Sequence, residues 1–115
     1  MNKMKRLRKD KDFQFVFKHG KSYANRQFVL YVLAQPEPSF SRFGLSVSKK
    51  MGNAVMRNHI KRLIKENLRH FADFIQLGND YIIISRRPVR LLSYAEFQTC
   101  LKHVLKKAGV MTPEG

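Results

Sequence analysis

The pattern with the clearest chemical meaning lies in residues 52–69, where positive side chains recur at every fourth position. The members of this series are Arg57, Lys61, Lys65 and Arg69. On a helix they share one arc, with Asn58 and Arg62 beside them and Glu66 outside it. Like charges at this spacing destabilise a helix by ~0.2–0.5 kcal/mol per pair, a sign that a phosphate backbone would reverse. The arc therefore predicts a nucleic-acid-binding surface, against the alternative of a merely solvated face.

The side chains on this arc also suit phosphate. Arginine makes planar, bidentate phosphate contacts that lysine cannot make, and Asn58 can read a base edge or a sugar hydroxyl. Lys49 and Lys50 precede the helix. Its N-terminal N–H groups and dipole therefore form a second candidate anion site.

The sequence does not contain a pattern of catalytic or metal-binding residues that would make this chain a nuclease by itself. Asp10 and Asp12 form the only close acidic pair and fit a helix start better than a two-metal site. The four histidines, at positions 19, 59, 70 and 103, lack metal-ligand spacing. His103 lies three residues after Cys100, a spacing that permits a catalytic pair of the cysteine thiolate and the histidine ring. A packed cysteine is the favoured interpretation. We expect no catalytic and no metal-binding residue in this chain.

The composition agrees with a polyanion as partner. The 115 residues carry 23 lysines and arginines against eight carboxylates, a formal charge of +15 on a chain with an ordinary apolar content. No apolar run approaches the ~18 residues of a membrane span, and the basic N-terminus lacks the apolar region of a secretory signal. The single cysteine excludes an intramolecular disulfide and a cysteine-based zinc site. We expect a cytoplasmic protein, with an anionic membrane surface as the weaker alternative partner.

Three helices and three strands are predicted. The helices cover residues 10–20 with Asp10 or Asp12 as cap, residues 53–71 with Asn53 as cap, and residues 93–109 with a Ser93–Glu96 capping box. The strands cover residues 27–34, 42–48 and 81–85, and the first two are expected to pair as a hairpin. The chain thus forms a single α+β domain of order α-β-β-α-β-α, with a flexible basic arm at 1–8 and a flexible tail at 110–115.

The stretch GLSVSKKMGNAVMRNHIKRLIKENLR, residues 44–69, resembles the bacterial ribonuclease P protein component, with its glycine–leucine–serine strand and arginine-rich helix. The resemblance continues through DFQFVFKHGKSYANRQFVLYVL at residues 12–33 and YIIISRRP at residues 81–88. It covers roughly residues 10–106. One departure is His59, which follows Arg57 and Asn58 where the family commonly has a second arginine. Because His59 lies outside the main arc, we expect an exposed histidine and the loss of one peripheral cation.

The resemblance implies a single-layer sheet packed with helices, ribosomal protein S5 domain 2-like, with a left-handed βαβ crossover around the motif helix. It implies the protein subunit of ribonuclease P, which removes the 5′ leader of precursor tRNA by endonucleolytic hydrolysis. The catalyst is the RNA subunit with Mg²⁺, so the protein needs no cofactor of its own. The expected partners are the catalytic RNA and precursor tRNA, with no small-molecule substrate.

Residue by residue, the resemblance assigns a cleft for the single-stranded leader to Phe13, Phe17 and Tyr31. The alternative for all three residues is an ordinary core position. The expected contacts to the catalytic RNA are Arg57, Asn58, Lys61, Arg62, Lys65 and Arg69. Possible rim and anion-site residues are Lys49, Lys50, Lys18, His19, Lys21 and Arg26. The competing functions are a ribosomal or general RNA-binding structural protein of the same fold and, less favoured, a stand-alone nuclease.

Overall fold

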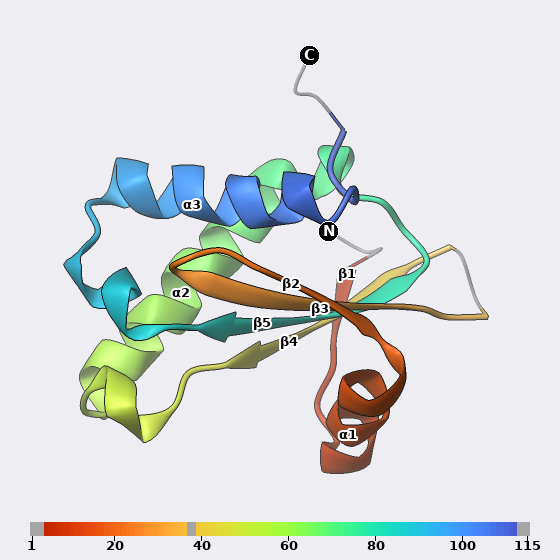
Figure 1. The fold of residues 1–115 in the computed structure, drawn as a ribbon, viewed down its shortest axis with the longest axis horizontal. Coiled ribbons are helices and arrows are strands. Elements are labelled where there is room, and N and C mark those ends of the chain that lie inside the picture. Colours follow the sequence, from red (N-terminus) through yellow and green to blue (C-terminus); the bar gives the residue numbers. More distant parts are fainter. Residues whose placement is uncertain (1–3, 37–38, 113–115) are drawn as a thin grey trace.

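The computed structural model describes residues 4–36 and 39–112, which form a five-stranded mixed sheet with helices on both faces (Figure 1). The strand order is β1-β4-β5-β3-β2. The strands are β1 (Met4–Arg6), β2 (Lys21–Ala24), β3 (Phe28–Ala34), β4 (Ser41–Ser46) and β5 (Asn79–Ser85). The helices are α1 (Asp10–His19), α2 (Ala54–Phe71) and α3 (Tyr94–Lys107), with short 3₁₀ segments η1 (Lys49–Met51), η2 (Ala72–Phe74) and η3 (Arg87–Leu91).

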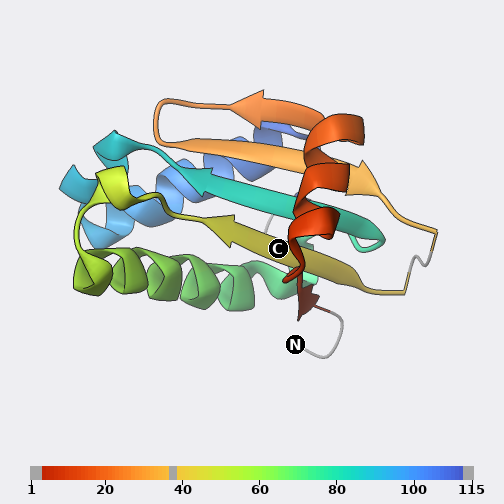
Figure 2. The same ribbon diagram turned by 90° about the horizontal axis from the view of Figure 1, so that it is seen from below.

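The helices are divided unequally between the two faces of the sheet. The apolar sides of α2 and α3 pack on one face, around Phe28, Leu30, Tyr81 and Ile83, in the larger core cluster. α1 lies alone on the other face and packs through Val16 against Ile82 (Figure 2). Much of that second face is therefore left without a helix over it.

The connection between β4 and β5 has the unusual hand that the family resemblance implies. The two strands are parallel neighbours, and α2 joins them. Seen from the α1 side in Figure 2, α2 passes behind the sheet between them in the left-handed sense. Such connections are right-handed in about 98% of proteins, so periodicity alone would not have predicted this one.

The hydrogen bonds that cap two of the predicted helices are present in the structure. The Asn53 side chain accepts a hydrogen bond from the Met56 amide, and Ser93 and Glu96 form a reciprocal capping box. The cap of α1 was wrong, because Lys9 occupies that position without a side-chain bond and Asp10 and Asp12 lie in the first turn. There the carboxylates still favour the helix through its dipole.

The expected hairpin between the strands at 27–34 and 42–48 is wrong. β5 lies between them, antiparallel to β3 and parallel to β4. Tyr81, Ile82 and Ile83 are fully buried. A strand that is apolar on both faces is covered best in the middle of the sheet, which explains the pairing. The short, largely exposed edge strand β2 was not predicted.

Both chain ends are more ordered than predicted over the described residues. Instead of a basic arm, Met4–Arg6 pairs with β4 in parallel, and the buried Leu7 donates its amide to the Phe43 carbonyl. At the other end Val110 and Met111 are buried, and Thr112 donates to the Phe74 carbonyl. The rest of the expected arm and tail, residues 1–3 and 113–115, lies outside the described residues. Within the described ranges, no helix has the length and apolarity needed to cross a bilayer.

Candidate nucleic-acid interface

The predicted arc of α2 is present on the solvent side of that helix. We call Arg57, Asn58, Lys61, Arg62, Lys65 and Arg69 the basic arc. Arg57 and Lys61 are half-buried, whereas the other four side chains are exposed. The opposite side of α2 packs into the core through Ile60, Ile64, Leu68 and Phe71. The 3.6-residue period therefore separates a charged side from a packing side along the whole helix.

Positive charge is concentrated at the C-terminal half of this arc. The pKa of Lys65 lies below its ordinary value because burial disfavours the ammonium form, and because Arg6 and then Lys61 add their repulsion. Arg6 comes from β1, a strand near the N-terminus that is far from α2 in the sequence. An anion bound among these three side chains would remove the repulsion, so the surface favours anionic ligands.

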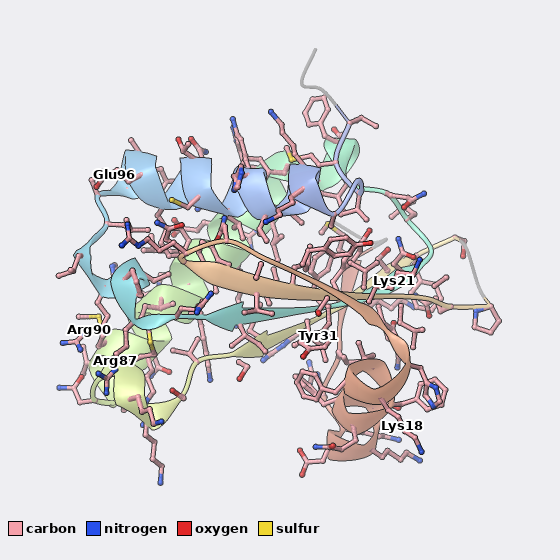
Figure 3. The ribbon with its side chains drawn as sticks, in the orientation of Figure 1. Lys18, Lys21, Tyr31, Arg87, Arg90 and Glu96 are labelled. Atoms are coloured by element: carbon pink, nitrogen blue, oxygen red, sulfur yellow. The ribbon has the colours of Figure 1, made fainter. Side chains whose placement is uncertain are left out.

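The aromatic residues assigned to a leader cleft do lie together. Phe17 and Tyr31 meet edge-on with ring centroids 4.9 Å apart, and the Phe13 ring lies 6.3 Å from that of Phe17. Tyr31 points from the sheet toward α1 (Figure 3). All three side chains are half-buried and pack against the buried cluster of Leu7, Val16 and Ile82 on the α1 face of the sheet. This aromatic cluster thus takes part in the packing of α1 and is also partly open to solvent.

Ionic and close steric contacts fix α1 above the sheet. Arg42 of β4 reaches the carboxylate of Asp80 with two hydrogen bonds, of 2.8 and 2.6 Å, and lies 3.5 Å from a carboxylate oxygen of Asp12 in α1. The ring of Phe13 covers Gly44, where an added Cβ would come within 2.5 Å of the ring. Glycine at this position therefore makes room for the aromatic cluster.

The six expected rim residues do not form one rim. Lys18, at the end of α1, and Lys21, at the start of β2, lie at the same end of the sheet. Lys21 pairs with Val32, which packs on the α2/α3 face, so Lys21 lies on the other face from Tyr31 (Figure 3). His19 turns to the other side of α1, where its ring lies 4.4 Å from that of Phe15. Arg26 follows β2, and Lys49 and Lys50 form η1, at the opposite end of the sheet. Three of the six residues, Lys18, His19 and Lys21, therefore lie at one end of the sheet, and the other three lie at the opposite end.

Other cations that the sequence did not single out join these surfaces. Arg87 and Arg90 of η3 are exposed and extend the positive charge near η1 (Figure 3). Arg6 and Arg8 lie beside α2 because β1 pairs with β4, and they were assigned to a free arm. The signal that could have placed them was Leu7, a lone apolar residue among cations that needs a buried site.

The residues weighed for catalysis have other partners. Cys100 is half-buried, and burial, followed by the nearby Glu96, raises the pKa of its thiol. The ring of His103 lies within hydrogen-bonding distance of the Asn25 side chain, 3.1 Å from Nδ2 to Nδ1. His59 is exposed beside Arg62, as expected for a rim position. In the described part of the chain, no three His, Cys, Asp or Glu side chains gather as a metal site would require.

Comparisons with known proteins agree with this geometry. The family model described as ribonuclease P matches residues 1–109. A ribonuclease P protein component of Geobacillus thermodenitrificans is 48% identical over 115 residues, all of this chain and 95% of the relative. Among solved structures, a Staphylococcus aureus RNase P protein mutant with defective mRNA degradation activity superposes with a TM-score of 0.87 and 46% identity, over 92% of this chain and 89% of that one. The RNase P protein of Thermotoga maritima gives 0.82 and 31%, over 96% and 99%. The chain therefore belongs to the ribonuclease P protein family.

Proposed function

We propose that this chain is the protein subunit of a cytoplasmic ribonuclease P that binds both the catalytic RNA and the 5′ leader of precursor tRNA. The basic arc holds the catalytic RNA. The aromatic cluster and the neighbouring sheet face hold the leader. The complex removes the leader by endonucleolytic hydrolysis and leaves the mature 5′ end of the tRNA.

One observation carries the proposal, namely that two surfaces suited to different RNAs lie on opposite faces of one sheet. The basic arc is rich in cations and favours the phosphates of any strand, folded or not. The aromatic cluster offers rings on which unpaired bases can stack, each such contact contributing ~1–3 kcal/mol. A protein domain with both surfaces can connect a folded RNA to a single-stranded RNA segment.

The role of this chain in the reaction is to position RNA. Leader contacts do not depend on the body of the tRNA, so they add the same binding energy to every precursor and broaden the range of substrates. Because they are lost once the leader is cut off, they favour precursor over product. We assign the Mg²⁺ of the reaction to the catalytic RNA, as the resemblance to the family implies.

The proposal is tested by adding this chain to a bacterial ribonuclease P RNA at low magnesium and measuring cleavage of precursor tRNA. We expect faster cleavage with the protein than without it, and no cleavage by the protein alone. No change in rate or in substrate affinity would contradict the proposal. Cleavage by the protein alone would favour a stand-alone nuclease.

A further inference from the structure

A groove of about 420 Å³ lies between β1 and α2, over the edge of β4. Its apolar floor is formed by Phe43, Leu45 and Leu68, with Leu7 and Phe13 at the α1 end. We call it the β1–α2 groove. Its volume lies in the ~300–1,000 Å³ range of pockets that bind small molecules.

The groove exists because β1 is shorter than β4. The two strands pair from Met4 and Ser41 only as far as Arg6 and Phe43. After Leu7 the chain turns away toward α1, while β4 continues to Ser46. Leu45 is therefore half-buried at an edge of the sheet that β1 does not cover.

The walls of the groove are positive on both sides. The cations that line it are Lys5, Arg6 and Arg8 from the β1 segment and Lys61, Lys65 and Arg69 from α2. No carboxylate belongs to the lining among the described residues. The pKa of Lys65 is lowered mainly by burial and then by Arg6 and Lys61, so the two walls repel each other across the groove. An anion between the walls would relieve that repulsion.

The floor and the walls together select one class of ligand. The floor has almost no polar side chain, and the buried ring of Phe43 is held in place by stacking on Tyr81, with centroids 4.6 Å apart. A ligand that fits has a flat, weakly polar body between two anionic groups. An unpaired nucleotide with its two phosphates has this form. In a duplex the base is turned inward, and an acidic peptide lacks the flat apolar part.

We propose that the β1–α2 groove binds one unpaired nucleotide of RNA, with its base on Phe43, Leu45 and Leu68 and its phosphates against the two walls. The proposal rests on the proposed function, because it takes the RNA to be one of the two RNAs of that complex. Phe13 belongs both to the groove and to the aromatic cluster, and Lys61, Lys65 and Arg69 belong both to the groove and to the basic arc. The groove therefore joins the two surfaces.

Binding of a single-stranded adenosine pentanucleotide, measured by fluorescence anisotropy on the full chain, tests the proposal directly. Leu45→Trp fills the groove without changing charge and should weaken binding by about 5- to 150-fold, the equivalent of one lost base contact. Arg6→Ala should lower the slope of log K against log salt by about 0.7, one phosphate contact to a single strand. Lys106→Ala is the matched control, since it removes one exposed charge from α3, and should leave the affinity unchanged.

Thermal melting separates a filled groove from a damaged fold. If Leu45→Trp lowers the melting temperature, the test rests on Arg6→Ala, whose side chain is exposed. Wild-type affinity in a stably folded Leu45→Trp variant would overturn the proposal, as would an Arg6→Ala salt slope equal to that of Lys106→Ala. Equal binding of the pentanucleotide and of a duplex of the same length would also overturn it.

The source of the nucleotide is resolved in the reconstituted complex. A loss of affinity for the catalytic RNA alone would assign the nucleotide to that RNA. A loss seen only with precursor that carries a leader would assign it to the leader. If the wild-type chain stimulates cleavage and the variants equal it in both measurements, the groove proposal fails and the proposed function stands. If the wild-type chain does not stimulate cleavage, the proposed function itself fails, whatever the pentanucleotide result.

Discussion

The ring of Phe17 in α1 meets the ring of Tyr31 in β3 edge-on, with centroids 4.9 Å apart and planes at 81°. This contact joins α1 to the sheet face that it covers, and both side chains remain half-buried. The same atoms can therefore stabilise the fold and meet a ligand. Experiments on this site must measure both properties.

Phe17→Ala should separate leader binding from binding of the catalytic RNA. We expect the affinity of the reconstituted complex for precursor tRNA to fall by about 5- to 150-fold, because one stacking contact is lost. Affinity for the catalytic RNA should stay near that of the wild type. Phe15→Ala is the control, since Phe15 is 56% exposed on the other side of α1. A lower melting temperature with unchanged precursor affinity would assign Phe17 to the core alone.

Gly44→Ala tests whether the position of Phe13 matters. The added methyl group would come within 2.5 Å of the ring, so the ring must move. We expect weaker binding of precursor with a leader and unchanged binding of mature tRNA, measured with the reconstituted complex. The double variant Gly44→Ala/Phe13→Ala should bind precursor no more weakly than Phe13→Ala alone. Additive losses would contradict this coupling.

The basic arc should reveal its phosphate contacts through salt dependence. Lys61→Ala or Lys65→Ala should reduce the slope of log K against log salt for the catalytic RNA by about 0.7–0.9, one phosphate contact. Titrations between low and physiological salt measure it. Lys106→Ala removes the same charge from α3 and should leave the slope as it is. An unchanged slope in both arc variants would exclude these lysines from the interface.

Tyr81 should make the fold sensitive to high pH. Burial raises the pKa of its phenol to about 12, against a weaker opposing effect of the hydrogen bond from Asn79. The neutral phenol stabilises the fold fully below pH ~10, and ionisation removes on the order of 3 kcal/mol as the pH rises toward 12. Urea unfolding at several pH values measures this loss. In Tyr81→Phe that part of the pH dependence should disappear, and an unchanged profile would contradict the assignment.

The helices were predictable because their signals are local. Asn53 and the Ser93–Glu96 box are capping patterns within four residues, and both have the expected bonds. Strand pairing depends on contacts between residues that are far apart in the sequence. The central place of β5 follows from burial on both faces, and β1 and β2 are edge strands with little apolar pattern.

The candidate site divides in the same way. The basic arc lies on a single helix, so its period was enough to predict it. The approach of Phe17 to Tyr31 depends on how α1 lies on the sheet, and only the family resemblance predicted it. The remaining features follow from how the strands are arranged. This arrangement separates Lys18 and Lys21 from Arg26, Lys49 and Lys50. It also brings Arg6 close to Lys65.

The central claim is that this chain holds the leader while the RNA subunit carries out the cleavage. The most direct test compares the affinities of the reconstituted complex for precursor tRNA and for mature tRNA, each relative to the catalytic RNA alone. We expect the protein to increase the affinity for precursor and to leave that for mature tRNA almost unchanged. An equal increase for both would contradict the claim and would indicate a general RNA-binding protein.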